Sequence, residues 1–145
     1  MTTTVSALFR GEPKEFKKPG LISGYIKTSV TELSVGLHIV DGDGCQNQKF
    51  HGGDDRLLHH IPSEHYKTLN HQYPDQNIFI PGSLAENIST TGLLETDVCI
   101  GDIFQIGEVS CQITEPRNPC GMIDTNYEIK GVMKFLLELK NTGWF

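Results

Sequence analysis

Short runs of β-branched and aromatic residues, each ended by glycine, proline or aspartate, constrain the fold of this chain more than any other feature. Such runs are typical of strands in a β-barrel or sandwich and not of a parallel α/β sheet. We predict seven strands, at Thr2–Leu8, Gly24–Thr31, Leu37–Val40, Asn77–Ile80, Asp97–Ile100, Ile103–Ile106 and Val109–Thr114. The fold class is therefore expected to be mainly β with minor α.

Two turn signals, at residues 101–102 and 107–108, join the last three of these strands into a meander. Apolar and polar residues alternate along the final strand, and this pattern places Cys111 on one face as a small hydrophobic residue. Cys99 lies between Val98 and Ile100, and we assign it the same role.

Two helices interrupt the strand pattern. The first is predicted over Ser63–Tyr73, after Pro62, with Ser63 as its N-cap. The second is predicted over Lys130–Lys140, where an apolar stripe ends at the Asn-Thr-Gly sequence of residues 141–143. Two aromatic residues then follow at 144 and 145. Either they pack back on the domain, or the chain is a piece of a longer protein.

Composition restricts the compartment and the partners. With 145 residues, of which 37% are hydrophobic and 21% charged, the chain has the size of one globular domain spanning residues 1–145. The net charge of −6 argues against a nucleic-acid-binding surface. No segment has the about 18 consecutive apolar residues of a membrane-spanning helix, or a signal peptide's apolar core. We therefore expect a cytoplasmic protein that binds neither nucleic acid nor membrane, with free thiols at its four cysteines.

The most chemically informative loop is Glu115–Gly121, which contains Cys120. Pro116 and Pro119 stiffen the chain around Arg117, and Gly121 allows a ligand to approach the backbone closely. A free thiol has a pKa of about 8.5, so a reactive or metal-binding cysteine needs a nearby positive charge. Arg117 is close enough in sequence to supply it, and a thiolate suits a soft metal. The alternative interpretation is a buried loop cysteine beside an exposed arginine.

Other glycine-rich loops offer weaker signals. His51 precedes Gly52-Gly53, whose backbone N–H groups are suited to an anionic ligand, with Arg56 available for a phosphate; a simple turn explains the same glycines. Asp43 lies in an Asp-Gly turn. His60 and His65 are five residues apart, which does not put them on one helical face and disfavours a zinc site.

In their order, these segments resemble a MOSC domain, the domain named for the C-terminal part of molybdenum cofactor sulfurase. The resemblance covers about residues 20–145 and rests on the following segments: Asp41-Gly-Asp43, His51-Gly-Gly53 with Arg56, His60-x-Pro-x-Glu-His65-Tyr66, Pro81-Gly-x-x-x-Glu86-Asn87, Gly92-Leu93, Ile100-Gly-Asp102 and Pro116-Arg-x-Pro-Cys120. The chain is most similar to the small stand-alone bacterial branch of YiiM-like proteins, which is linked to protection against N-hydroxylated base analogues.

The resemblance implies a MOSC-type β-barrel with a few short helices. It implies that Cys120 binds molybdenum in the molybdenum cofactor (molybdopterin) or carries activated sulfur. Pyridoxal phosphate binding is implied only as a term associated with the family as a whole. The residues implied to line the cofactor and substrate site are Asp43, His51, Arg56, His60, Asn87 and Arg117.

The implied activity is the reduction of N-hydroxylated compounds, such as base analogues and hydroxylamines, with electrons from a separate redox protein. The alternatives are a non-catalytic carrier of the cofactor or its sulfur, a truncated inactive barrel, and an unrelated thiol enzyme. Stand-alone family members continue beyond Gly143–Phe145 into a further helical segment, so a C-terminally truncated domain is expected. Ala85 stands where the family usually has glycine, which restricts the loop if that position needs a positive φ.

Overall fold

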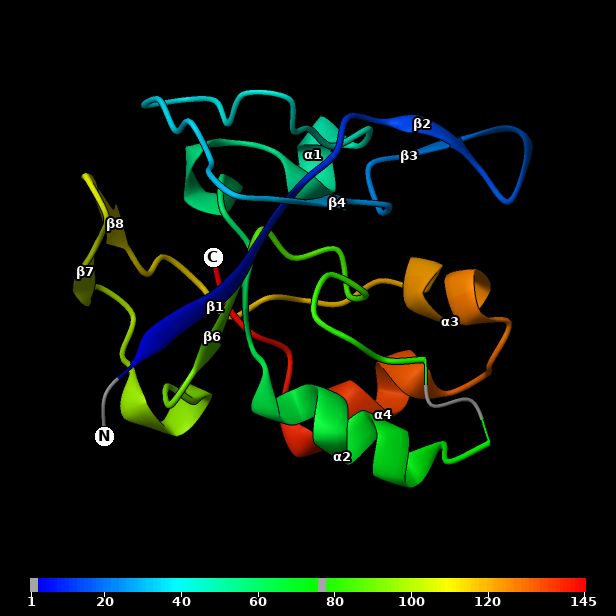
Figure 1. The fold of residues 1–145 in the computed structure, drawn as a ribbon. Coiled ribbons are helices and arrows are strands. Elements are labelled where there is room, and N and C mark those ends of the chain that lie inside the picture. The colour runs from blue at the N-terminus through cyan, green and yellow to red at the C-terminus, as the bar shows by residue number, and fades with distance from the viewer. Residues whose placement is uncertain (1–2, 76–77) are drawn as a thin grey trace.

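The computed structural model describes residues 3–75 and 78–145 (Figure 1). The strands are β1 Thr4–Arg10, β2 Lys14–Phe16, β3 Lys18–Ser23, β4 Thr28–Val30, β5 His60–Pro62, β6 Ile88–Thr91, β7 Ile103–Ile106 and β8 Val109–Gln112. The helices are α1 Gln48–His51, α2 Glu64–Gln72, α3 Met122–Tyr127 and α4 Val132–Leu139, with short 3-10 turns η1 Asp54–Arg56 and η2 Glu95–Asp97.

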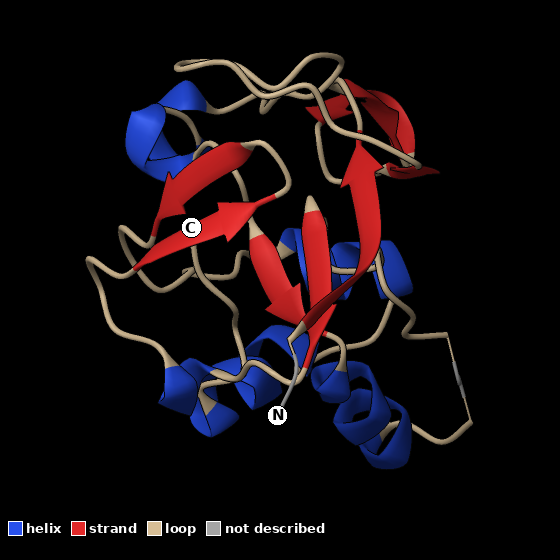
Figure 2. Cartoon of the chain, turned by 60° about the vertical axis from the view of Figure 1, so that its left-hand side comes forward, coloured by secondary structure: helices blue, strands red, loops and turns tan. Residues whose placement is uncertain are grey.

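A four-stranded mixed sheet in the order β4-β1-β6-β5 forms the centre of the fold (Figure 2). Strand β1 is antiparallel to both of its neighbours, whereas β5 and β6 are parallel and are connected through α2. Two parallel strands run in the same direction, so a tight turn cannot join them and a longer crossover connection is needed. Strands β2-β3 and β7-β8 form two separate hairpins. The expected sheet-rich fold with a few helices is confirmed; a closed barrel is not found among the described strands.

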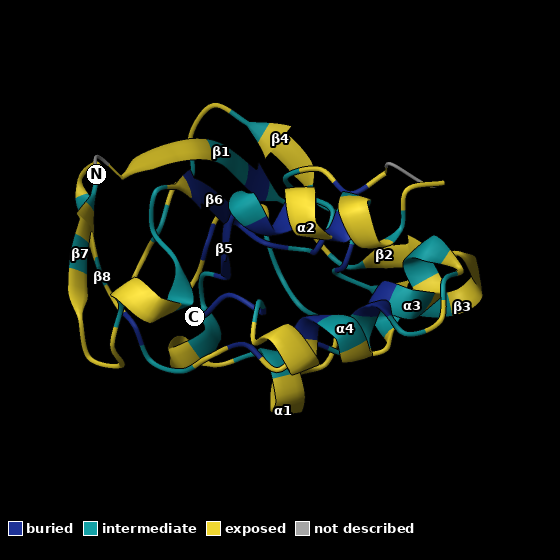
Figure 3. Ribbon diagram, turned by 90° about the horizontal axis from the view of Figure 1, so that it is seen from below, coloured by how far each residue is buried: buried dark blue, intermediate teal, exposed yellow. Residues whose placement is uncertain are grey.

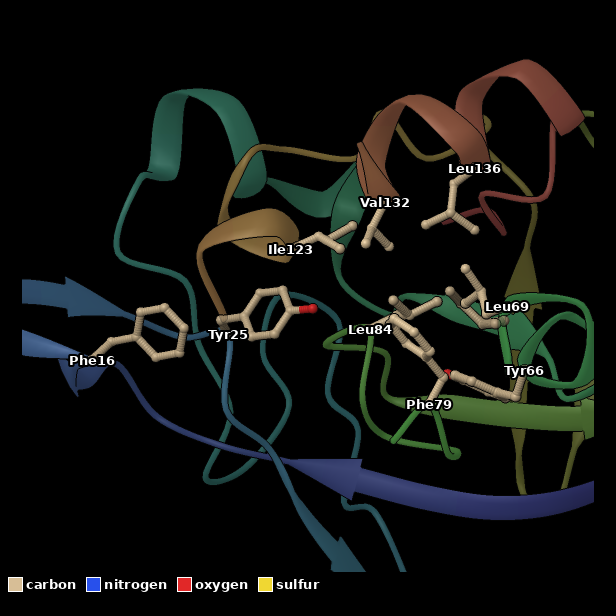
Figure 4. Close-up of a cluster of buried hydrophobic side chains, with 10 residues drawn as sticks. Phe16, Tyr25, Tyr66, Leu69, Phe79, Leu84, Ile123, Val132 and Leu136 are labelled. Carbon is tan, nitrogen blue, oxygen red and sulfur yellow. The ribbon is translucent and has the colours of Figure 1, made fainter. Parts of the chain in front are cut away.

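The hydrophobic core lies where helices α2, α3 and α4 pack against β5, the segment between α2 and β6, and the residues Phe16 and Tyr25 (Figure 4). Helix α4 buries Val132 and Leu136, and α2 buries Tyr66 and Leu69. These spacings of three and four residues put each pair on one helical face, so the outer faces stay exposed (Figure 3). The whole buried cluster comprises Phe16, Tyr25, Ile61, Tyr66, Leu69, Phe79, Leu84, Ile123, Val132 and Leu136.

Several sequence predictions are confirmed. Helices α2 and α4 lie within the two predicted ranges, and β1, β7 and β8 overlap three predicted strands. Of the predicted strand Gly24–Thr31, only the part that becomes β4 is extended and paired. Ser63 is the N-cap of α2, but its hydroxyl lies 2.8 Å from the hydroxyl of Ser6 and does not cap a helix N–H group.

Three predicted strands do not form. Leu37–Val40 is a loop in which Val40 is buried and forms an isolated bridge with Val35, while Leu37 is 87% exposed and Ile39 58% exposed. Within Asp97–Ile100, the backbone N–H of Cys99 donates to the Asp102 carboxylate and not to a neighbouring strand. Cys99 is exposed, so it is not the core residue that the sequence predicted. Of Asn77–Ile80, Asn77 lies outside the described residues. Phe79 instead bonds through both its N–H and its C=O to the side chain of Asn70.

The last residues pack back on the domain. Trp144 is 7% exposed, and its ring centroid lies 4.0 Å from that of His60. Its backbone exchanges two hydrogen bonds with His60, of 2.9 and 3.1 Å. Phe145 pairs through its backbone with residues 114 and 115. This segment therefore lies between β5 and the start of the Cys120 loop, because Trp144 forms bridges with both His60 and Pro116.

Candidate functional site

A pocket of about 750 Å³ lies where four loops and the end of the chain converge. Its wall contains most of the residues implied by the family resemblance: Asp43, His51, Arg56, Asn87, Arg117 and Cys120. It also contains residues that the sequence did not single out, among them Tyr25, Lys27, Cys45, His59 and Phe145. The structure therefore brings distant loops together around one cavity, and Cys120 contributes a free, half-buried thiol to it.

The Cys120 loop is held at both ends. The N–H of Arg117 donates to the carbonyl of Gly143 at 3.0 Å, which ties the loop to the C-terminal segment. The carbonyl of Cys120 accepts the N–H of Ile123 at 3.2 Å, which ties it to the first turn of α3. Pro119 lies between these anchor points and Pro116 directly before the first, and each fixes its own φ, which restricts the loop that carries the thiol.

Arg117 is a buried cation in the pocket wall. It is 9% exposed, and its Nη1 atom has no hydrogen-bond partner among the described residues. Burial lowers the pKa of its guanidinium, against the opposing influence of Tyr25, Cys120 and Glu86. Burying a charged group without full pairing costs several kcal/mol. The interpretation of an exposed arginine is therefore wrong, and the wall at Arg117 favours an anionic or electron-rich ligand.

Two histidines in the pocket are held in the neutral form. Burial lowers the pKa of His51, and the positive charges of Arg117 and Arg56 lower it further. Burial lowers the pKa of His59 well below its usual value, and Arg117 adds to that effect. Neutral imidazoles can donate and accept hydrogen bonds without adding to the positive charge of the wall.

His60 is a correction to the expected site. It lies outside the pocket, with its Nε2 atom 2.7 Å from the Thr90 hydroxyl and its ring against Trp144. Burial lowers its pKa to about 4. Successive side chains of an extended segment point in opposite directions, so His59 faces the pocket and His60 does not.

Asp43 and Asn87 hold the pocket together rather than facing a ligand. The Asp43 carboxylate accepts the N–H of Gly11 at 2.8 Å, the Nδ2 group of Asn87 at 2.9 Å and the ammonium of Lys27. The Asn87 side-chain oxygen accepts the N–H of His59 at 3.0 Å. Both side chains are occupied by protein partners. Lys27 has no local pattern that would predict this role, because only the fold places it beside Asp43.

Arg56 lines the pocket but is paired. Its Nε and Nη2 groups both donate to the Glu115 carboxylate, the second at 3.3 Å. The hydrogen bond to Glu115 raises the pKa of Arg56. Glu115 precedes the Cys120 loop, so this two-point contact joins the η1 segment to that loop and leaves Arg56 fewer donors for a phosphate.

A buried carboxylate organises the Pro81–Asn87 turn. Glu86 is 0% exposed, and it accepts hydrogen bonds from the Tyr66 hydroxyl, the Ser89 hydroxyl and the N–H groups of Gly82 and Leu84. Ala85 beside it has φ of 65°, the left-handed conformation that glycine adopts without strain. The family's usual glycine at this position therefore has a physical reason.

Replacing Ala85 by glycine is expected to raise the free energy of unfolding by about 0.5–1 kcal/mol, because the left-handed strain of alanine exceeds the added chain entropy of glycine. Urea unfolding at pH 7 measures this change. Ala7→Gly in strand β1 is the matched control and is expected to destabilise the protein, since Ala7 is extended. A loss of stability in Ala85→Gly would contradict the strain argument.

A second thiol, Cys45, lines the same pocket. Burial raises its pKa, Lys27 lowers it and Asp43 raises it again. Its protonated form is therefore favoured, and it provides an internal comparison for Cys120. Within residues 3–75 and 78–145, no group of three or more His, Cys, Asp or Glu side chains is arranged to hold a metal ion. None of the helices in the same residues has the length and apolar character needed to cross a membrane.

Comparisons with known proteins identify the family of this chain. The MOSC domain family model matches residues 47–145. The protein YiiM of Escherichia coli (strain K12) is 37% identical over 116 residues, which cover 79% of this chain and 50% of YiiM. A protein of Gibberella moniliformis named "Reductase" is 30% identical over 96 residues, covering 65% of this chain and 17% of that protein.

Solved structures of YiiM proteins match this chain as well. The crystal structure of Escherichia coli YiiM matches with a TM-score of 0.72 at 32% identity, over 81% of this chain and 55% of that one. The YiiM structure from Geobacillus stearothermophilus matches with a TM-score of 0.77 at 26% identity, over 99% of this chain and 66% of that one. The chain thus spans about half the length of Escherichia coli YiiM. It belongs to the MOSC domain family, in its YiiM-like branch.

Proposed function

We propose that the pocket binds the molybdenum cofactor, with the Cys120 thiolate as the protein ligand of the metal. The observation that carries this proposal is that a half-buried thiol and the buried Arg117, whose Nη1 atom lacks a partner among the described residues, line the same pocket. MOSC domains are associated with this cofactor, and its phosphate is an anion that would satisfy the arginine.

The residues present fit such a group. A cavity of about 750 Å³ is within the range of small-molecule sites. Arg117 and Lys27 provide positive charge, although Lys27 is partly neutralised by Asp43. The neutral rings of His51 and His59 can exchange hydrogen bonds with the polar edge of a heterocycle. Gly52 and Gly53 also line the cavity, and glycine lets a ligand approach the backbone closely.

When bound, the cofactor would supply a metal centre that accepts electrons and delivers them to a substrate. The protein's own residues would orient and hold it. Arg117 would place a buried positive charge in the wall that also holds Cys120, where it can stabilise a bound anion. The two anchored ends of the loop would hold the Cys120 thiol in place.

We further propose that the natural reaction is the reduction of N-hydroxylated small molecules with electrons from a separate redox protein. The N–O bond breaks, two electrons and two protons are taken up, and an amine and water leave. The similarity to a protein named "Reductase" and the membership of the YiiM-like branch support this choice.

Molybdenum analysis tests the binding step. Protein is purified from a host that makes the cofactor, as wild type, Cys120→Ala and Cys45→Ala. We expect molybdenum in stoichiometric amount in wild type and Cys45→Ala and its loss in Cys120→Ala, because only Cys120 lies beside Arg117. Both cysteines line the same pocket, so the comparison controls for changes in pocket shape. Retention in Cys120→Ala, or loss only in Cys45→Ala, would refute the ligand assignment.

Turnover is tested separately, with the loaded protein, a chemically reduced dye as artificial donor, and benzohydroxamic acid as substrate. Formation of the amide supports the reductase. If the protein holds molybdenum but forms no amide, while it transfers cofactor to an apo-enzyme, it is a carrier and the reductase proposal is wrong.

A further inference from the structure

The C-terminal segment connects the central sheet to the pocket through backbone hydrogen bonds. On one side, Trp144 pairs with His60, the first residue of β5. On the other side, Trp144 forms a bridge with Pro116, and the carbonyl of Gly143 accepts the N–H of Arg117 at 3.0 Å. The segment therefore occupies the position of a strand between β5 and the Cys120 loop, and the backbone of Arg117 is fixed through Gly143.

Gly143 has little freedom to move. Its φ is +72°, and a Cβ atom added to it would lie 2.0 Å from the carbonyl oxygen of His60. Its N–H donates at 2.8 Å to the Oε1 atom of Glu95, from the η2 segment. Burial alone would raise the pKa of Glu95, but its hydrogen bond and ion pair with His65 lower it overall. Glu95 is thus a charged acceptor, which makes a stronger hydrogen bond than a neutral one.

We propose that Glu95 is a positioning residue for Arg117. Glu95 binds the N–H of Gly143, and the C=O of the same residue binds the N–H of Arg117, so two consecutive hydrogen bonds link the η2 carboxylate to the pocket cation. His65 holds Glu95 from helix α2, with its Nε2 atom 2.8 Å from each carboxylate oxygen. The identity of the ligand rests on the proposed function, whereas the positioning role does not.

The backbone of Arg117 is anchored at Gly143, whereas its Nη1 group has no hydrogen-bond partner among the described residues. The placement of the guanidinium therefore depends on the loop backbone. A shift of Gly143 would move the charge relative to a bound anion, and electrostatic binding depends on preorganised geometry.

The matched control is Glu64. Its Oε1 atom accepts the N–H of Gly92 at 2.7 Å, so it also uses a carboxylate to hold a glycine backbone, and neither residue lines the pocket. Glu95→Ala and Glu64→Ala each remove one such contact. Glu95→Gln keeps an oxygen acceptor for Gly143 and serves as the conservative variant.

The first measurement is amide hydrogen exchange at Arg117, followed by nuclear magnetic resonance. Glu95→Ala is expected to speed this exchange by about tenfold or more, since a hydrogen bond to a charged group is lost next to it. Glu95→Gln is expected to give an intermediate rate, and Glu64→Ala the wild-type rate. The second measurement is the molybdenum content of the same variants, which should fall in Glu95→Ala and stay unchanged in Glu64→Ala.

An unchanged exchange rate in Glu95→Ala, or an equal increase in Glu64→Ala, would overturn the proposal. If Glu95→Ala does not fold, the Glu95→Gln rate decides: an Arg117 rate equal to wild type overturns it, and a faster rate supports it. If wild-type protein holds no molybdenum, the proposed function fails, while the exchange comparison still tests the positioning role.

Discussion

Asp43→Asn is expected to lower the free energy of unfolding by about 3–5 kcal/mol, the cost of leaving one member of a buried ion pair without its partner. The side chains of Lys27 and Asp43 are only 6% and 9% exposed, so water cannot take over the solvation of the lysine. The same carboxylate binds Gly11 and Asn87, and the asparagine amide cannot accept all of these hydrogen bonds. The loops around the pocket would lose their common anchor.

Urea unfolding at pH 7 measures the Asp43→Asn effect. The control is Glu138→Gln, which removes the exposed pair of Lys134 and Glu138 on helix α4, where the side chains are 75% and 62% exposed. That change is expected to stay within about 0.5 kcal/mol, because solvent screens exposed pairs. Replacing Lys27 by methionine in the Asp43→Asn background should recover part of the loss. Equal effects of Asp43→Asn and Glu138→Gln would show that the buried pair contributes no more than a surface pair.

Lowering the pH from 7 to 4 is expected to reduce the free energy of unfolding by about 3 kcal/mol through His60 alone. Burial lowers the pKa of this imidazole from 6.5 to about 4, so the folded protein keeps it neutral over that interval. The unfolded chain takes up the proton first, as the pH falls through 6.5, and stability is lost from there down to about 4. Below that value the folded form is protonated too, and the loss levels off. The pKa of His59 is lowered as well and adds to the slope.

Urea unfolding between pH 7 and 4 tests this dependence. In His60→Gln, the difference in stability between the two ends of the range should shrink, whatever the variant's stability at pH 7. His71→Gln, at an exposed position of helix α2, should keep the wild-type difference. A pH dependence in His60→Gln as steep as in wild type would mean that His60 is not the group responsible.

The elements that could be predicted are those with a local pattern. Helices α2 and α4 have apolar residues at helical spacing, and the β7-β8 hairpin has alternation and a glycine turn. Strands β5 and β6 have neither, because they are short, are mostly buried and include polar residues such as Ser89 and Thr90. They are strands because each is the other's partner, and that pairing is visible only in three dimensions.

The candidate site also contains residues that the sequence could predict and residues that only the fold brings to the pocket. The order of the loops was sufficient to place Arg117, Cys120 and Asn87 at one pocket. The distinction between His59 and His60 depends on the phase of β5, and a shift of one residue reverses which side chain faces the pocket. Lys27 was not predicted as a site residue, because its contact with Asp43 exists only in the folded protein. The structure therefore places Cys120 and Arg117 at the pocket. Their roles in binding stay predictions.

The central position of β1 has a consequence for synthesis of the chain. Leu8 pairs with Val30 on one side and with Ile88 on the other, so one edge of β1 acquires its partner early and the second must wait until β6 has left the ribosome. During that interval the strand presents an open edge to other nascent chains. Its first three residues, Thr4 to Ser6, are exposed and largely polar, which limits such association. A large apolar residue in place of Thr4 would favour aggregation of newly made protein.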